Sequence, residues 1–309
     1  MALTDHRWVG KALAQKTISA LHLLPLYHQG QQWAGRLRNF HPNARIEYAG
    51  KLASEVGLVR LAGARVAEIG TGWVPVIPMG LHLLGVASIE SFDLSRHLRP
   101  GLTLRAASLL AECIPDLARR AGADPGTLRA RAAALAAAPT LEALLEAMKF
   151  TYHAPADFSQ SRIAPQSIDI VYSNLVLEHV TPSALRGILR ESRRVLRPDG
   201  RCWHTVDYTD HYSHTLRGLS PLNFMRYGRR FWDALGQNDI LYQNRLRRSD
   251  YVRAFEESGF EIESVRDFAL PPAAAREVHA DFAHYSTGDL RCGSSRFVLK
   301  PAQATPARA

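Results

Sequence analysis

The sequence predicts an α/β fold, in which a doubly wound seven-stranded sheet carries helices on both faces. From about residue 61, short apolar runs typical of buried strands alternate with helical patterns, an order that favours parallel strands joined by crossover helices. The last two apolar runs lack such a helix and resemble a hairpin, so we expect the last strand to be antiparallel. The chain has 309 residues, 46% of them hydrophobic, which suffices for one large domain with additions.

Residues 1–60 are predicted to form a helical extension or lid without a chemical motif. Trp8, Leu13 and Ile18 are spaced loosely as in an amphipathic helix, which we expect to pack on the body or over a substrate rather than on a membrane. The strands that follow are predicted at Val66–Ile69, Ser88–Phe92, Thr151–Ala154, Ile168–Tyr172, Arg201–Val206, Phe260–Val265 and Arg296–Leu299.

The predicted core spans residues 61–300 and contains two insertions. Residues 95–149 are rich in Ala, Leu and Arg and exceed the dozen or so residues that a crossover needs, which predicts two or three short helices forming a helical cap. Residues 208–250 form the second insertion, and 301–309 a flexible tail. A helix is also expected behind Thr181, ending before the turn signal that follows it.

The net charge is +9 with a pI near 9.7, which is compatible with acidic partners or with a solvated basic surface. The three cysteines are far apart and form no CxxC pair, which predicts a reduced, cytoplasmic protein. No apolar run approaches the roughly 18 residues of a membrane span, and charged residues interrupt any signal-peptide pattern. A homo-oligomer is left open.

The first strand ends in Glu68-Ile69-Gly70-Thr71-Gly72, a turn that predicts close approach of a ligand to the backbone. Asp93 ends the second strand, where an acid can accept both hydroxyls of a ribose. NAD-binding folds share this pair but use a third glycine to seat a pyrophosphate, whereas Trp73, Val74 and Pro75 follow Gly72 here. An acid would repel a pyrophosphate, so the turn favours a nucleoside that bears an amino acid.

Five segments in order resemble the motifs of class I S-adenosylmethionine-dependent methyltransferases, of the small-molecule type-11 group. They are "VAEIGTG", "SFDL", "YHAPADF", "IDIVYSNLVLEHV" and "LRESRRVLRPDGR". The resemblance covers roughly residues 60–210 and implies a Rossmann-like fold, with S-adenosylmethionine as cofactor and S-adenosylhomocysteine as product.

The resemblance also implies roles for individual residues. Glu68, Gly70, Thr71 and Gly72 would hold the methionine part of the cofactor, Asp93 would bind the ribose with Leu94 against the adenine, Asp157 and Phe158 would meet the adenine amino group and ring face, and Ser173 and Asn174 would lie beside the sulfonium. The missing third glycine and the long insertion before Asp157 depart from the family pattern.

Candidates for a general base crowd the segment after the fifth strand. We expect His211 to take this role, oriented by Asp207 or Asp210, with His204 as a further candidate and Glu178 at the mouth of the site. The strand pattern predicts that His204 and Asp207 point to opposite faces of the sheet. Two acids and three histidines within eleven residues also leave a divalent metal open, although no H-x-x-x-H spacing favours one.

Residues 208–250 mix aromatic and arginine side chains, which predicts an acceptor pocket that could be anionic, or an ordinary amphipathic helix. Ser173-Asn174-Leu175-Val176 lacks the prolines of the tetrad found in enzymes that methylate base amines, so no nucleic acid is expected.

The expected function is methyl transfer to oxygen or nitrogen of a small-molecule acceptor, such as a specialised metabolite or a saccharide intermediate. Three alternatives stay open. They are C-methylation of an anionic prenyl or lipid substrate with Mg²⁺, a non-catalytic cofactor-binding module, and a nucleotide-binding oxidoreductase.

Overall fold

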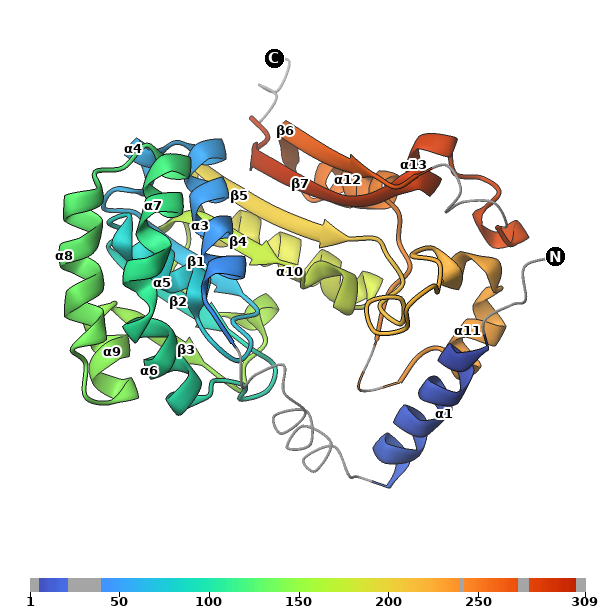
Figure 1. The fold of residues 1–309 in the computed structure, drawn as a ribbon. Coiled ribbons are helices and arrows are strands. Elements are labelled where there is room, and N and C mark those ends of the chain that lie inside the picture. Colours follow the sequence, from blue (N-terminus) through green and yellow to red (C-terminus); the bar gives the residue numbers. More distant parts are fainter. Residues whose placement is uncertain (1–5, 22–39, 239, 241, 272–277, 304–309) are drawn as a thin grey trace, which may run out of the picture.

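A computed structural model of the chain describes residues 6–21, 40–238, 240, 242–271 and 278–303. Its centre is a seven-stranded sheet in the order β3-β2-β1-β4-β5-β7-β6 (Figure 1). The strands are β1 (Arg65–Ile69), β2 (Ser88–Phe92), β3 (Phe150–His153), β4 (Ile168–Asn174), β5 (Leu196–Asp207), β6 (Phe260–Ala269) and β7 (Cys292–Pro301). All seven predicted strands are confirmed.

The strand directions follow from the connections between them. β1 pairs in parallel with β2 and β4, β2 with β3, and β4 with β5. β7 runs antiparallel to both β5 and β6, as the hairpin-like pattern predicted. The carboxyl ends of β1, β2, β4 and β5 therefore meet at one edge of the sheet, where open α/β sheets bind their ligands.

The two faces of the sheet carry separate cores, because successive strand residues point to opposite sides. Val66, Tyr172 and Trp203 pack with α3 (Asn43–Val56) and α5 (Val76–Leu83). Val171 and Val206 pack on the opposite face with α10 (Pro182–Val195) and α12 (Arg248–Glu257). α10 starts at the predicted place, where the Thr181 hydroxyl accepts from the Ala184 N–H at 3.2 Å.

The segment between β2 and β3 forms four helices, α6 (Pro100–Ser108), α7 (Leu110–Ala121), α8 (Pro125–Ala136) and α9 (Leu141–Ala147). Asp124 and Thr140 each cap the helix that follows them, and the four helices exceed the two or three predicted. A further break between α6 and α7, at Leu109, was not predicted. In Figure 1 these helices stand outside α3 and α5, and their apolar side chains continue the same core.

A third core joins the N-terminal helix to the insertion after β5. Trp8 of α1 (Arg7–Ala20) is fully buried, stacks on Trp232 of α11 (Arg229–Leu235) at 5.3 Å, and lies 5.0 Å from the Tyr227 ring. α1 thus covers α11, although the two lie more than 200 residues apart in sequence (Figure 1). For residues 7–20 the predicted packing on the body is confirmed; the 22–39 part of the predicted extension lies outside the described residues.

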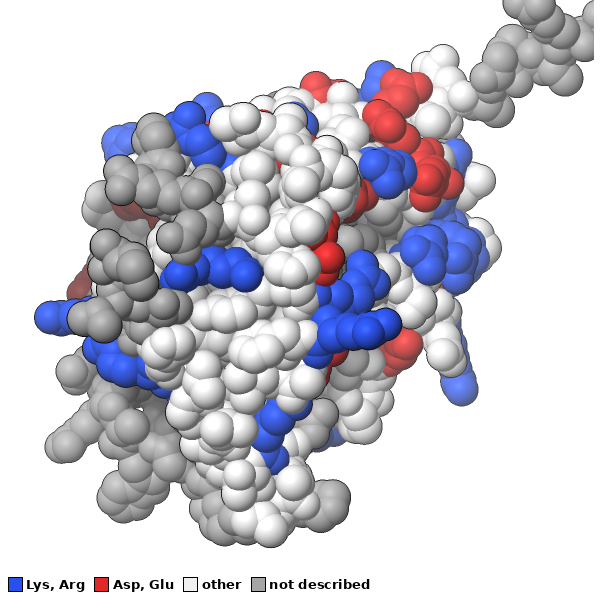
Figure 2. All heavy atoms as spheres, turned by 90° about the vertical axis from the view of Figure 1, so that its right-hand side faces the viewer, with Lys and Arg blue, Asp and Glu red and all other residues white. Residues whose placement is uncertain are grey.

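Basic side chains do not form one continuous patch on the face that Figure 2 shows. On the face that Figure 2 shows, Lys and Arg side chains lie in several separate groups among uncharged atoms. Cys113, Cys202 and Cys292 are buried free thiols. Within the described ranges, every helix is too short or too polar to cross a bilayer.

The burial of Trp8 predicts how firmly α1 is held. Trp8→Ala should lower the free energy of unfolding by about 3 kcal/mol, because it removes a buried ring system and leaves a cavity. Leu13→Ala on the same helix is the matched control, since Leu13 is 51% exposed and should change it by less than about 0.5 kcal/mol. Urea unfolding followed by circular dichroism measures both; equal effects would contradict the docking of α1.

Candidate functional site

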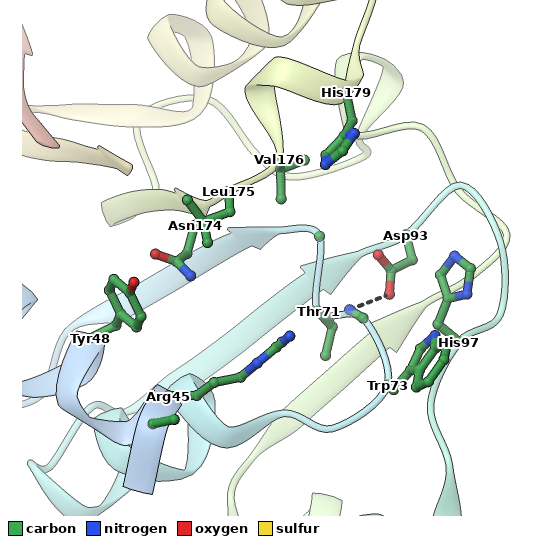
Figure 3. A pocket seen from close by; sticks show the side chains of 13 residues that line it. Arg45, Tyr48, Thr71, Trp73, Asp93, His97, Asn174, Leu175, Val176 and His179 are labelled. Carbon is green, nitrogen blue, oxygen red and sulfur yellow. Dashed lines mark hydrogen bonds between the residues drawn. The ribbon is translucent and has the colours of Figure 1, made fainter. Parts of the chain in front are cut away.

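A pocket of about 490 Å³ opens at the carboxyl edge of β1, β2 and β4, within the range of small-molecule sites, roughly 300–1,000 Å³. Figure 3 shows its walls, with α3 on one side and the turn after β1 on the other. The lining residues are Ala44, Arg45, Tyr48, Gly70, Thr71, Gly72, Trp73, Asp93, His97, Asn174, Leu175, Val176 and His179.

The turn after β1 depends on its two glycines for different reasons. Gly70 has φ +83°, and a Cβ on it would lie 2.5 Å from Cγ2 of Val176, so both conformation and space require glycine. Gly72 has φ +70° but open space around it, so only conformation does. α5 begins at Val76, and Pro78 occupies its first turn, where a missing N–H leaves no hydrogen bond unmade. Pro75 is the N-cap residue of α5, so both prolines lie at the start of this helix.

Glu68 lies beneath this turn. It is 3% exposed, and its carboxylate accepts hydrogen bonds from Thr71 Oγ1 at 2.8 Å, Ser91 Oγ at 2.6 Å and Tyr172 OH at 2.5 Å. Burial raises the pKa of Glu68 to about 7, against the opposing effect of these hydroxyls. Its oxygens face this network, so Glu68 holds Thr71 and joins β1 to β2 and β4.

Asp93 reaches the pocket from the end of β2. Its Oδ2 accepts from the Gly72 N–H at 3.2 Å (dashed in Figure 3) and from Tyr152 OH at 2.8 Å. Burial raises the pKa of Asp93 to about 6, although both hydrogen bonds oppose the shift. A carboxylate anchored in this way can accept from the hydroxyls of a bound ribose.

The end of β4 supplies the third wall. Asn174 lines the pocket, and its buried Oδ1 has no hydrogen-bond partner within the described residues. Leu175 has φ +58°, an unusual conformation for a side chain of this kind, and its N–H donates to Thr205 O at 2.9 Å. Ser173 is fully buried, with its Oγ 2.8 Å from His204 Nδ1. Of the two residues predicted beside the sulfonium, only Asn174 lines the pocket.

None of the three residues predicted to contact the adenine lines this pocket. Leu94 is 70% exposed. Asp157 caps the short helix η1 (Phe158–Gln160) by accepting from the Ser159 N–H at 2.8 Å, and it lines a separate cavity of about 750 Å³. Phe158 is buried with its edge on Phe92. The roles of these three residues stay predictions.

Eight of the lining residues were not among the predicted site residues: Ala44, Arg45, Tyr48, Trp73, His97, Leu175, Val176 and His179. Arg45 and Tyr48 enter from α3 of the N-terminal extension, and Trp73 and His97 lie beyond the glycine turn (Figure 3). No motif marks them, because α3 reaches the pocket only through tertiary packing. The Trp203 indole fixes that packing by donating to Glu55 on α3 at 2.8 Å.

Acids and histidines gather beside the pocket. His211 Nε2 lies 3.6 Å, and His214 Nε2 3.5 Å, from Asp207 Oδ2. The His211 ring is 4.8 Å from the His179 ring. Burial would raise the pKa of Asp207, but the nearby His211 imidazole and the hydrogen bonds from Thr209 hold it below its ordinary value. Glu178, in the short helix η2 (Leu177–His179), is 1% exposed, and burial raises its pKa well above the ordinary value.

Two of the proposed catalytic residues lie away from this group. His204 is fully buried on the opposite face of the sheet and stacks on Phe255, and burial lowers its pKa to about 3. Asp210 is fully buried, where it accepts from the Tyr212 N–H and from Asn223 Nδ2 and so shapes the loop. The predicted division of β5 between the two faces is confirmed, since Asp207 lines a pocket on the α3 side.

That second pocket, of about 400 Å³, adjoins the first and shares Tyr48 and Leu175 with it. Its remaining lining residues are Lys51, Thr205, Asp207, Thr209, Phe268, Ala269, Leu270, Gly293, Ser294 and Arg296. The two pockets place a ligand at the carboxyl end of β1 and β2 next to one at the end of β5.

The arginine-rich insertion does not form an anion pocket from Arg245, Arg247 and Arg248. Arg245 donates to the carbonyls of Phe224 and Tyr227, and the fully buried Arg247 donates to those of Tyr208, Asp289, Leu290 and Cys292. Arg248 pairs with Asp267 at 2.7 Å. Arg247 thus joins the insertion to the segment that leads into β7, and Arg245 joins two parts of the insertion to each other.

The comparisons with known proteins agree with this geometry. The family model described as "Methyltransferase domain" matches residues 121–204, from the end of α7 into β5. Outside the matched residues, the glycine turn, the acid after β2 and the strand order with its antiparallel β7 are also those of this family. The chain is a class I S-adenosylmethionine-dependent methyltransferase. No curated protein matches it in sequence.

Solved structures similar to this methyltransferase include several methyltransferases. An S-adenosylmethionine-dependent methyltransferase from Mesorhizobium loti is 20% identical over 82% of this chain and 97% of that chain, with a TM-score of 0.43. A geranyl diphosphate methyltransferase in complex with S-adenosylmethionine is 13% identical over 84% and 85%, with a TM-score of 0.45. A ribosomal protein L11 methylase from Lactobacillus delbrueckii subsp. bulgaricus is 11% identical over 84% and 80%, with a TM-score of 0.39. These likenesses are loose, and the fold rests on the sheet itself.

The cofactor of the methyltransferase is S-adenosylmethionine. The absent third glycine fits this cofactor, because no pyrophosphate has to be seated on α5. Glu68 beneath the turn is also compatible with this cofactor, because S-adenosylmethionine has no pyrophosphate that the acid would repel.

Gly70 and Gly72 offer a test of the turn. Gly70→Ala should cost at least about 2 kcal/mol of unfolding free energy, because Cβ meets Val176 as well as an unfavourable φ. Gly72→Ala should cost about 1 kcal/mol, from φ alone. Adding Val176→Ala to Gly70→Ala should recover part of the loss in a double-mutant cycle. Urea unfolding is measured for the unmodified chain, Gly70→Ala, Gly72→Ala, Val176→Ala and the double variant. Equal costs for the two glycine substitutions, with no coupling to Val176, would refute this explanation.

The raised pKa of Asp93 predicts a pH-dependent affinity. If Asp93 binds the ribose as the resemblance implies, the ionised carboxylate is the stronger acceptor, and protonation through a pKa of about 6 should weaken S-adenosylmethionine binding about tenfold between pH 7 and pH 5. Asp93→Asn should bind at least about tenfold more weakly at pH 7 and lose this pH dependence. Calorimetric titration at both pH values measures it. The same pH dependence in Asp93→Asn would assign the effect to another group.

Proposed function

We propose that this methyltransferase transfers the methyl group to an oxygen or nitrogen of a small polar molecule bound in the pocket at the end of β5. The observation that carries the proposal is the pair of adjoining pockets that share Tyr48 and Leu175. In-line displacement needs the acceptor atom and the sulfonium on opposite sides of the methyl group. A cofactor in the first pocket and an acceptor in the second satisfy this requirement across Leu175.

The cofactor would lie along the first pocket. Asp93 would bind the ribose hydroxyls, and the glycine turn and Asn174 would border the methionine part and the sulfonium. Arg45 supports this orientation, because its exposed guanidinium extends into the pocket from α3 (Figure 3) and offers a cation for the methionine carboxylate. Leu94, Asp157 and Phe158 would meet the adenine at the margin.

The second pocket suits a molecule with both polar and apolar parts. Tyr48, Phe268 and Leu270 supply apolar surface, and Thr205, Thr209 and Asp207 supply hydrogen-bonding groups. Its cations already have partners, since Arg296 pairs with Glu55 at 2.8 Å and Lys51 with Glu47 at 2.8 Å. A neutral acceptor is therefore favoured over a phosphorylated one.

His211 would take the proton that an oxygen or nitrogen acceptor loses. It is 10% exposed and stands 3.6 Å from Asp207, which lines the acceptor pocket and would orient the imidazole. Glu178 would border the same position. His204 and Asp210 are left out of this role because neither side chain reaches the group.

The rest of the chain would serve this site. We infer that 61–300 acts as one catalytic core, with 95–149 and 208–250 as insertions and the N-terminal extension closing the pocket through α3. The separate basic groups in Figure 2 favour a small acceptor over nucleic acid, which would need a continuous basic surface. The buried free thiols are compatible with the cytoplasm.

The proposal is tested by S-adenosylhomocysteine formation from S-adenosylmethionine with a panel of hydroxylated and amine-bearing metabolites. With the best acceptor, His211→Ala should lower kcat by roughly 10²-fold and leave S-adenosylmethionine affinity unchanged, as for a residue that acts only on the acceptor. Asp207→Asn should lower kcat in the same direction but by less.

His204→Gln is the matched control, because it removes an imidazole from the same strand region but on the far face. Its kcat should stay within about threefold of the unmodified enzyme, given equal stability. Normal turnover in His211→Ala would remove this residue from the mechanism. A failure of every oxygen and nitrogen acceptor, with methylation of a carbon nucleophile instead, would overturn the proposed reaction class.

A further inference from the structure

Three metal-ligating side chains converge at the edge of the cofactor pocket. Glu178 and His179 come from the loop after β4, and His211 comes from the segment after β5; one donor atom of each lies within 4.8 Å of the others. We propose that Glu178, His179 and His211 form a binding site for a divalent transition-metal ion. None of the three residues is among those proposed to bind S-adenosylmethionine, although His179 lines the same pocket, and the proposal does not depend on the identity of the acceptor.

The Glu178 carboxyl group is the strongest sign of a ligand. It is 1% exposed, and within the described part of the chain neither of its oxygens has a hydrogen-bond partner. A buried carboxylate without partners is costly unless it is protonated or binds a cation. Asp207 nearby adds a second negative charge to this buried position. A metal ion would offset both the burial and this repulsion.

The two imidazoles are prepared to coordinate. His179 Nδ1 lies 2.8 Å from the Tyr242 carbonyl oxygen, which can only accept, so Nδ1 carries the hydrogen and Nε2 keeps its lone pair. A backbone carbonyl in this position is a common means of orienting a metal-bound histidine. His211 Nε2 is buried and lacks a hydrogen-bond partner among the described residues, with Asp207 Oδ2 at 3.6 Å.

A second donor set, Asp207, His211 and His214, shares His211 but is already engaged. Asp207 Oδ1 accepts from the N–H of Thr209 at 2.8 Å and from its hydroxyl at 2.7 Å. His214 Nε2 lies 2.8 Å from the same hydroxyl. The set with Glu178 is therefore favoured, and Asp207 acts as an orienting neighbour of His211.

The donors also indicate the kind of ion. Two imidazoles and one carboxylate suit Zn²⁺ or Fe²⁺ better than Mg²⁺ or Ca²⁺, which prefer oxygen ligands. Coordination would draw the donor atoms from as much as 4.8 Å to about 3.3 Å apart, as bonds near 2.0–2.1 Å require. Since His179 lines the cofactor pocket, the remaining coordination positions would face bound ligands. With an ion bound, His211 would be its ligand instead of a proton acceptor, and the ion would lower the pKa of a coordinated acceptor hydroxyl.

Calorimetric titration of the untagged, metal-stripped chain with Zn²⁺ tests the site, and metal analysis after gel filtration gives the stoichiometry. We expect one Zn²⁺ per chain, with affinity at least about tenfold lower in Glu178→Gln, His179→Ala and His211→Ala. Two controls should keep the affinity within about twofold. His214→Ala removes the competing set, and His41→Ala removes a surface histidine that pairs with Glu112 at 3.1 Å.

Thermal unfolding of each variant, measured without metal, separates loss of the site from loss of the fold. No Zn²⁺ binding by the unmodified chain, or equal binding by Glu178→Gln of unchanged stability, would overturn the proposal. A loss in His214→Ala equal to that in His211→Ala would overturn the assignment to Glu178 and His179. Because the titration needs no acceptor, a failure here leaves the proposed methyl transfer intact, and a failure of the methylation assay leaves the metal site intact.

Discussion

The buried Glu68 carboxyl group is the interaction on which the site depends most. Hydroxyls of Thr71, Ser91 and Tyr172 surround it, so one side chain joins the turn after β1 to β2 and β4 beneath the first pocket. These bonds lie below the pocket, and the backbone of the turn, rather than the acid, faces the ligand. In the same turn, Gly70 lies so close to Val176 that a Cβ at this position would meet the Val176 side chain.

The other polar groups of the site lie along the same sheet edge, each just after the carboxyl end of a strand. Asp93 follows β2 and lines the first pocket, while Leu175 follows β4 with a positive φ and lines both pockets. The acids and histidines follow β4 and β5. Buried polar atoms without partners, on Asn174, Glu178, Thr205 and His211, gather at this edge among the described residues, as expected for a site completed by its ligands.

The sequence was sufficient for most of the fold and for part of the site. The seven strands could be predicted because buried strands are short apolar runs, and the glycine turn because it immediately follows one. Arg45 and Tyr48 could not be predicted, because α3 reaches the pocket through packing on Trp203, about 150 residues away in sequence. The convergence of Glu178 with His211 was invisible for the same reason, and linear spacing gave a weak metal pattern. The sequence left open whether the arginine-rich segment forms an acceptor pocket. Charge alone does not show that Arg245 and Arg247 bind carbonyls of their own chain.

The central claim is that cofactor and acceptor meet across Leu175, with S-adenosylmethionine between the glycine turn and Asp93. A crystal structure of the chain with S-adenosylhomocysteine tests this most directly. The account predicts the ribose hydroxyls within hydrogen-bond distance of Asp93, the methionine carboxylate near Arg45, and the sulfur directed past Leu175 toward Asp207. Density for the product in the cavity beside Asp157 alone, or a sulfur directed away from Leu175, would contradict it.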